Sequence, residues 1–162
     1  MHTIDSMILD ALKASFESVN SIKEQCEILD NFHSMSDRAR VRDTYYQRAD
    51  MVSKQLYNEL SRLIHEAKLR LNYTKMYYPS LIVNFIRANA LIQRGNAVID
   101  DVTTSNVFLG DVQKLKAINR SSYSLDVMVT KTTARWLKIL FVLIWSGYEL
   151  MRARKQVRLR VS

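Results

Sequence analysis

The nearest approach to a metal-binding pattern in this sequence is Asp30-x-x-His33, in which two ligand-type side chains lie about one helical turn apart. Helical dimetal centres, however, use two Glu-x-x-His pairs together with carboxylates from other helices. The remaining histidines, His2 and His65, belong to no such motif. The sequence therefore predicts no metal site.

Other groups that carry chemistry are equally sparse. Asp100 and Asp101, with Asp111, could bind a cation or act as acid–base carboxylates, but adjacent residues point apart and acidic loop residues are usually solvated. Cys26 lies on an apolar helix stripe, where a thiol is expected to belong to the core. The three glycines are isolated, so no phosphate-cradling loop is formed, and a Gly-x-Ser-x-Gly elbow is absent. We therefore expect a protein that is not an enzyme and has no cofactor.

The composition indicates a few long helices. The chain of 162 residues has the size of a single domain, with an ordinary apolar fraction of 48%. It contains only 3 Gly and 1 Pro, whereas strand-rich folds use these residues at their many turns. A single cysteine cannot form an internal disulfide, and the N-terminus lacks the basic-then-apolar order of a signal peptide. We expect an intracellular protein, either soluble or associated with a particle.

The spacing of apolar residues predicts an all-α fold, an elongated bundle of four or five helices. A stop is expected at Gly95, and the periodicity between 97 and 123 is poor, apart from a short helix near 111–118. We expect one domain over 1–155 and a basic C-terminal arm over 156–162. The main predicted helices are 5–32, 37–76, 80–94 and a last helix that starts after 124–126 and runs to about 155.

The second predicted helix is the clearest element. Its apolar residues step by four, four and three, an eleven-residue period that suits a straight helix. At 1.5 Å per residue, a helix of about 40 residues is on the order of 60 Å long, more than a compact domain of this mass needs. The residues of this stripe are Val41, Tyr45, Ala49, Val52, Leu56, Leu60, Leu63, Ala67 and Leu71.

The net charge of +8 is unevenly distributed. Residues 1–37 carry a net charge of −5, residues 38–94 carry +7, and residues 131–162 carry +7. The acidic first helix could pair with basic helices of its own bundle, or the positive excess could meet an external polyanion.

Two clusters of basic residues with neighbouring tyrosines are candidate nucleic-acid contacts, because cations neutralise phosphates and aromatic rings stack on bases. The first lies beside Tyr45 and Tyr46, and the second precedes Tyr77 and Tyr78. No named nucleic-acid-binding module is present, so readout of a specific base sequence is not expected. The basic residues are Arg38, Arg40, Arg42, Lys68, Arg70 and Lys75.

The segment 134–151 contains an uninterrupted apolar run from Ile139 to Trp145, which can be extended to Tyr148. A membrane-spanning helix needs about 20 apolar residues, whereas shorter runs are more often buried core. We therefore favour a helix buried against the segment 80–94 over a membrane anchor.

The last seven residues alternate apolar and basic side chains, as in an edge strand that adds to another protein's sheet. The other interpretation is a frayed helix end whose cations complement the helix dipole. Of these two interpretations we adopt a docking arm, composed of Arg152, Arg154, Lys155, Val157, Arg158, Leu159, Arg160 and Val161.

These features favour a structural or assembly subunit of a larger multi-protein particle, virion-like or ribonucleoprotein. Its expected partners are other protein subunits, and a homo-oligomer is one form that such an assembly could take. The first alternative is a basic helical nucleic-acid-binding protein, and the second is a small membrane-associated protein that uses the segment 134–151.

Overall fold

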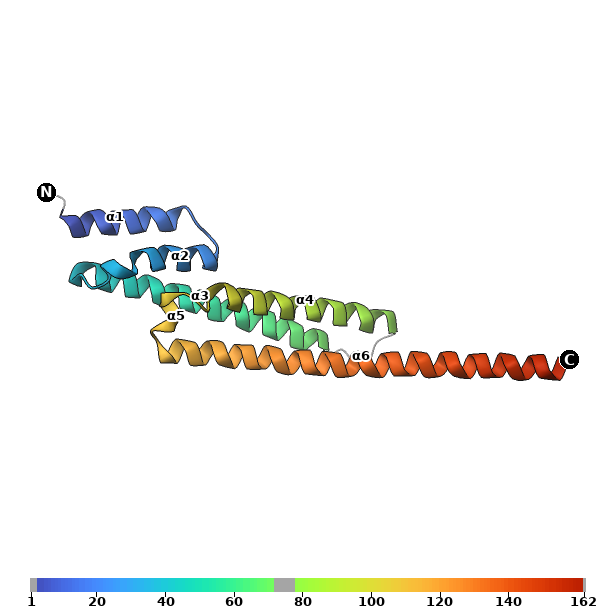
Figure 1. The fold of residues 1–162 in the computed structure, drawn as a ribbon. Helices are drawn as coiled ribbons and strands as arrows, with labels where there is room; N and C mark the ends of the chain where they lie inside the picture. Colours follow the sequence, from blue (N-terminus) through green and yellow to red (C-terminus); the bar gives the residue numbers. More distant parts are fainter. Residues whose placement is uncertain (1–2, 72–77, 162) are drawn as a thin grey trace.

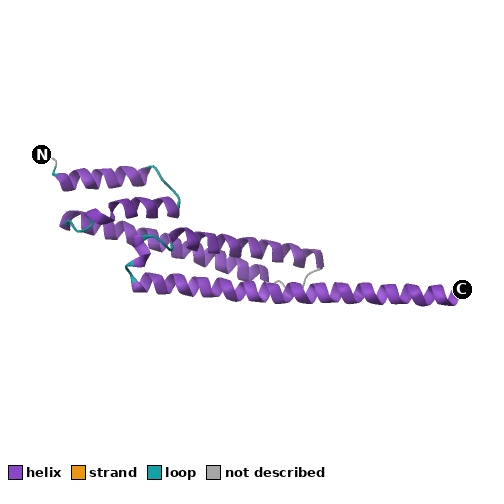
Figure 2. Cartoon of the chain, viewed as in Figure 1, coloured by secondary structure: helices purple, strands orange, loops and turns teal. Residues whose placement is uncertain are grey.

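The fold is entirely helical over the residues described by a computed structural model, 3–71 and 78–161 (Figure 2). The predicted fold class is therefore confirmed at the level of secondary structure. In this part of the chain there are six α-helices and one 3₁₀ turn (Figure 1). Their bounds are α1 Ile4–Glu17, α2 Ile22–Phe32, η1 His33–Met35, α3 Ala39–Leu71, α4 Tyr78–Val102, α5 Asn106–Leu109 and α6 Val112–Val161.

The first predicted helix is in fact two. A break after Glu17 separates α1 from α2, and the two helices lie side by side at the N-terminal end of the molecule (Figure 1). The Ser18 hydroxyl donates to the Ser15 carbonyl at 2.8 Å, and the Ser21 hydroxyl accepts from the Glu24 N–H at 3.1 Å. Serines that satisfy the terminal backbone groups of helices favour a break of this kind, which a continuous apolar stripe conceals.

The core is built on α3, and here the predicted stripe is confirmed. All nine stripe residues, from Val41 to Leu71, are buried. They pack against α2, α4 and α6, so one face of α3 supplies the centre of the molecule. The described helix has 33 residues; its predicted extension beyond Leu71 lies outside the described residues.

The predicted stop at Gly95 is wrong, because α4 continues through this glycine to Val102. A Cβ atom at Gly95 would lie only 3.0 Å from a methyl carbon of Leu125 on α6. Gly95 therefore allows two helices to approach closely instead of ending one of them. Gly147 has no such role, because a Cβ atom at this position would meet nothing within 4 Å.

The segment 97–123, whose periodicity is poor, is helical for most of its length. It contains the end of α4, the four-residue α5 and the beginning of α6. Val107 and Phe108 of α5 are buried, and the Asp111 carboxylate accepts from the Gln113 N–H at the start of α6. The poor periodicity arises because short elements packed on several sides have no single apolar face.

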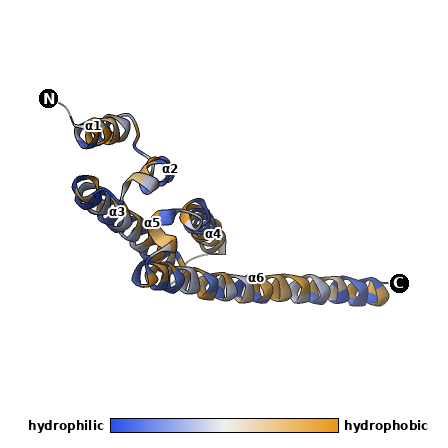
Figure 3. Ribbon diagram, turned by 60° about the vertical axis from the view of Figure 1, so that its left-hand side comes forward, coloured by the Kyte–Doolittle hydropathy of each residue, from blue (hydrophilic) through white to orange (hydrophobic). Residues whose placement is uncertain are grey.

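The longest helix is α6, with 50 residues, on the order of 75 Å. It joins the predicted short helix near 111–118 to the last predicted helix and includes residues 156–161. Its buried side chains end at Ile139, which is 8% exposed. Beyond this point α6 projects past the other helices (Figures 1 and 3). The prediction that the apolar run is buried against segment 80–94 is therefore wrong for residues after Ile139.

Candidate docking surface on α6

The projecting part of α6 carries ten large apolar side chains that are 44–72% exposed, which we call the apolar belt. Soluble proteins rarely expose contiguous apolar patches beyond roughly 300–600 Å², and larger ones mark interaction surfaces. Figure 3 shows hydrophobic positions, interspersed with hydrophilic ones, along the part of α6 that extends away from the other helices. The belt consists of Leu137, Leu140, Phe141, Val142, Leu143, Ile144, Trp145, Tyr148, Leu150 and Met151.

The base of the belt is anchored in the bundle. The ring of Trp136 packs against that of Phe85 on α4, with centroids 5.6 Å apart. The Arg135 guanidinium donates to the Leu71 carbonyl, so it satisfies a backbone acceptor in the last turn of α3. These contacts fix the direction in which α6 leaves the bundle.

Aromatic side chains follow one another along the belt. The rings of Phe141 and Trp145 are stacked with centroids 6.5 Å apart, and the Trp145 and Tyr148 centroids are 6.1 Å apart. From Ile139 to Trp145 every residue is apolar, so the helix is apolar around its whole circumference for two turns. A helix that is apolar on all sides is normally buried.

The residues of the predicted docking arm form the distal end of α6. They are helical and exposed, and the extended strand-like form is not what the structure shows. Their basic side chains surround the helix, because Arg152, Arg154, Lys155, Arg158 and Arg160 point in five different directions at about 100° per residue. Their function as a docking element stays a prediction.

The candidate nucleic-acid contacts do not form one surface. The cluster at Arg38, Arg40 and Arg42 lies at the start of α3, whereas Lys68 and Arg70 lie near its end, roughly 40 Å away at 1.5 Å per residue. Lys75 lies outside the described residues.

Several of these cations also have partners within the chain. Arg38 forms an ion pair with Asp5 at 2.8 Å, and Arg42 donates to the carbonyls of Ser36 and Asp37. Arg70 donates to the Asn84 side-chain oxygen at 3.2 Å. The interpretation that the acidic N-terminal segment pairs with basic helices of the same bundle is thus supported at Arg38.

Sequence reasoning missed a different basic groove between α3 and α6. Its volume is about 470 Å³, and Lys68, Lys131 and Arg135 lie along it beside Tyr123, whose side chain is 71% exposed. The cations come from two helices that are far apart in sequence, so no local motif indicates the groove.

The residues with potential for chemistry have structural roles. The Asp30 carboxylate accepts from the Ser105 hydroxyl at 2.9 Å and from the Asn106 N–H at 2.8 Å, so it ties α2 to the start of α5. His33 Nδ1 lies 3.2 Å from the Tyr45 hydroxyl. Within the described ranges, no group of three or more His, Cys, Asp or Glu side chains could hold a metal ion.

Burial keeps Cys26 in its unreactive form. Desolvation raises the pKa of its thiol from 9.0 to about 11, and it also raises the pKa of the neighbouring Tyr45 to about 12. A thiol with a raised pKa is a poor nucleophile at neutral pH because little thiolate is present.

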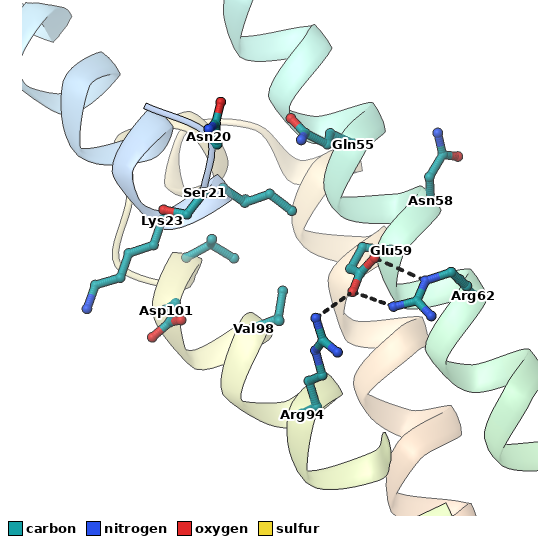
Figure 4. A pocket seen from close by; sticks show the side chains of 12 residues that line it. Asn20, Ser21, Lys23, Gln55, Asn58, Glu59, Arg62, Arg94, Val98 and Asp101 are labelled. Atoms are coloured by element: carbon teal, nitrogen blue, oxygen red, sulfur yellow. Dashed lines mark hydrogen bonds and ion pairs between the residues drawn. The ribbon is translucent and has the colours of Figure 1, made fainter. Parts of the chain in front are cut away.

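A cavity of about 560 Å³ between α2, α3 and α4 is lined mostly by polar residues, together with Ile22, Val98 and Val102 (Figure 4). Glu59 in its wall lies 2.9 Å from the Arg62 guanidinium and 3.8 Å from that of Arg94. The hydrogen bond from Arg62 lowers the pKa of the Glu59 carboxyl, so this carboxylate stays ionised and paired. Such a group is a weak candidate for a general base.

No helix in the described part of the chain has the length and apolar character needed to cross a membrane. Comparison with protein-family models, with curated proteins and with solved structures finds no match for this chain.

Proposed function

We propose that this protein is a non-enzymatic structural subunit of a larger multi-protein particle, virion-like or ribonucleoprotein, and that it docks through the projecting part of α6. The observation that carries the proposal is the apolar belt, which the folded chain leaves exposed on a helix anchored by Trp136 and Arg135. A surface of ten large, exposed apolar side chains favours a bound partner over permanent exposure to water.

The organisation of the chain supports the same proposal. Helices α1–α5 and the first half of α6 form an elongated helical bundle with its own core, and the rest of α6 is a helical extension. We place the docking element from about Leu137 onward, so it includes the belt and the basic arm of residues 156–162. Other protein subunits are the expected partners within the particle, inside the cell.

A second candidate function is binding of nucleic acid without sequence readout. The groove with Lys68, Lys131 and Arg135 favours it, because three cations beside the exposed Tyr123 match phosphates and a base. Binding through this groove should fall steeply with salt. Replacing Lys131 and Arg135 with Gln should weaken binding to all single-stranded sequences alike, measured by fluorescence anisotropy.

The test of the proposed function is sedimentation analysis of lysates from cells that produce the chain. Full-length protein should sediment with a particle far heavier than the 18.9 kDa monomer, whereas a chain ending at Leu140 should sediment as a free monomer. Treatment with nuclease distinguishes a ribonucleoprotein from a protein shell. Sedimentation of the full-length chain as a free monomer would contradict the proposal.

A further inference from the structure

The apolar belt has a wide apolar side and a narrow basic side. At about 100° per residue, eight of the ten belt residues fall on one arc of about 200° that contains no charged side chain between Leu137 and Met151. Only Val142 and Trp145 fall on the opposite arc. Between Leu137 and Met151 that arc carries one cation, Lys138, and one acid, Glu149, and the cations Arg135 and Arg152 flank it, so its net charge with these two flanking residues is positive.

The width of this apolar side argues against a second copy of the chain as the occupant. A helix that packs on one partner helix buries a narrow stripe, as in a coiled-coil seam, and α6 would still expose most of its belt in such a pair. Lipid acyl chains, in contrast, cover a wide apolar face of a helix that lies in the membrane interface.

The positive charge of α6 also argues against a second copy of the chain and favours an anionic surface. Residues 131–162 carry a net charge of +7, so parallel α6 helices would place their basic ends side by side. Antiparallel helices paired around Trp145 would place Arg152 opposite Lys138 of the other copy. Like charges at these positions oppose self-association, whereas an anionic surface attracts all of them.

The bundle does not obstruct a flat surface under the belt. The side chains of Leu125, Met128 and Ile139 are buried on one side of α6. Five highly exposed belt residues, spaced alternately by four and three, lie on the opposite side: Leu137, Phe141, Ile144, Tyr148 and Met151. Only about 13 residues separate the cations Lys138 and Arg152, about 20 Å of helix, which is less than the roughly 30 Å of a hydrocarbon core. This length suits a helix that lies along the interface.

We infer that the projecting part of α6 docks on an anionic phospholipid surface, with the wide apolar side of the belt in the acyl region and the basic side chains among the headgroups. This inference rests on the proposed function, since it names the surface that the docking element of the subunit meets. Trp145 and Tyr148 then lie at the boundary between headgroups and acyl chains, where aromatic side chains with polar atoms are favoured.

The experiment is flotation of the full-length chain with vesicles of phosphatidylcholine alone or with phosphatidylserine added. We expect flotation with the anionic vesicles, much less with the neutral ones, and a decrease as salt rises. Ile144→Glu with Met151→Glu should lower the bound fraction by at least about tenfold, because two charges enter the apolar side.

A matched control variant separates the effect of the apolar side on flotation from the effects of net charge and of misfolding. Met7→Glu with Met51→Glu adds the same two charges at exposed methionines on α1 and α3, and should leave flotation close to that of the unmodified chain. For the cations, Arg152→Gln with Arg154→Gln should lower binding to anionic vesicles, whereas Arg40→Gln with Arg87→Gln, at exposed positions on α3 and α4, should lower it far less. Circular dichroism verifies that each variant is folded.

Three outcomes overturn the inference. The first is a folded full-length chain that does not float with any vesicle. The second is flotation that Ile144→Glu with Met151→Glu leaves unchanged. The third is a defined oligomer in lipid-free buffer that the same pair dissociates, without flotation, which assigns the belt to a second copy. Particle sedimentation that persists in detergent, combined with no flotation, would retain the proposed function and reject the lipid surface.

Discussion

The two long helices α3 and α6 differ in the burial of their apolar residues. On α3, one apolar stripe is buried along the whole described helix, and mostly polar and charged residues occupy the rest of its surface. On α6, the first half follows the same rule up to Ile139, and the second half exposes side chains of the same types. The comparison teaches that an apolar stripe with polar flanks is covered by other helices of the same chain, whereas the apolar residues of the projecting half of α6 are not covered by any described residue, although side chains of this kind are normally buried.

The largest expected effect comes from placing a charge on the buried stripe. Leu60→Asp should unfold the protein or destabilise it by more than about 4 kcal/mol, because an unpaired charge would be buried in the core. The measurement is thermal unfolding followed by circular dichroism. Ile144→Asp on the exposed belt should change the melting temperature little; similar destabilisation by the two variants would remove the distinction between the helices.

A smaller effect is expected at the glycines of α4 and α6. Gly95→Val should destabilise the fold by roughly 1–3 kcal/mol, because the new side chain would overlap Leu125. Gly147→Ala meets open space and should be neutral or stabilise the helix by up to about 1 kcal/mol. Urea unfolding of both variants measures the difference, and a stabilising Gly95→Val would show that α4 and α6 are not in close contact there.

The buried half should also lose stability at high pH. The folded-state pKa of Cys26 is raised from 9.0 to about 11, so the folded chain holds its proton more tightly than the unfolded chain does. This contribution is complete below about pH 9 and is lost as the pH rises toward about 11. Cys26→Ala should flatten part of this fall, as measured by urea unfolding between pH 8 and pH 11. The pKa of Tyr45 is raised from 10.0 to about 12, so Tyr45 should still cause a fall in stability above about pH 10 in this variant.

The smallest effect on stability is expected from removing the part of α6 beyond Leu140, which holds most of the belt. A chain ending at Leu140 keeps every buried residue of α6, so its melting temperature should stay within a few degrees of that of the full-length chain. Its ellipticity should fall by the share of the removed helix, and its tendency to associate should be lost. A strongly lowered melting temperature would show that the distal half of α6 packs on the bundle.

Much of the fold was accessible from residue patterns. The eleven-residue stripe of α3 predicted its buried face residue by residue, because a long helix with one partner-facing side repeats that side in its sequence. The break between α1 and α2 was hidden by an apolar stripe that continues across it, and the course of α4 was misjudged because a glycine at a helix contact resembles a glycine at a helix end. The groove beside Lys68 and Lys131 could not be predicted, since its two sides come from distant segments.

By itself, the sequence determined the helical class, the buried stripe of α3 and the uneven distribution of charge, because these depend on local propensity, short periodicities and composition. Only the tertiary structure decided where α6 leaves the bundle, and therefore whether the run from Leu140 to Met151 is core or surface. Burial depends on which other segments reach a side chain in space. For a segment that is apolar on every side, such as Ile139–Trp145, the sequence indicates only that something must cover it. Within the described residues, the other helices bury side chains of α6 only as far as Ile139.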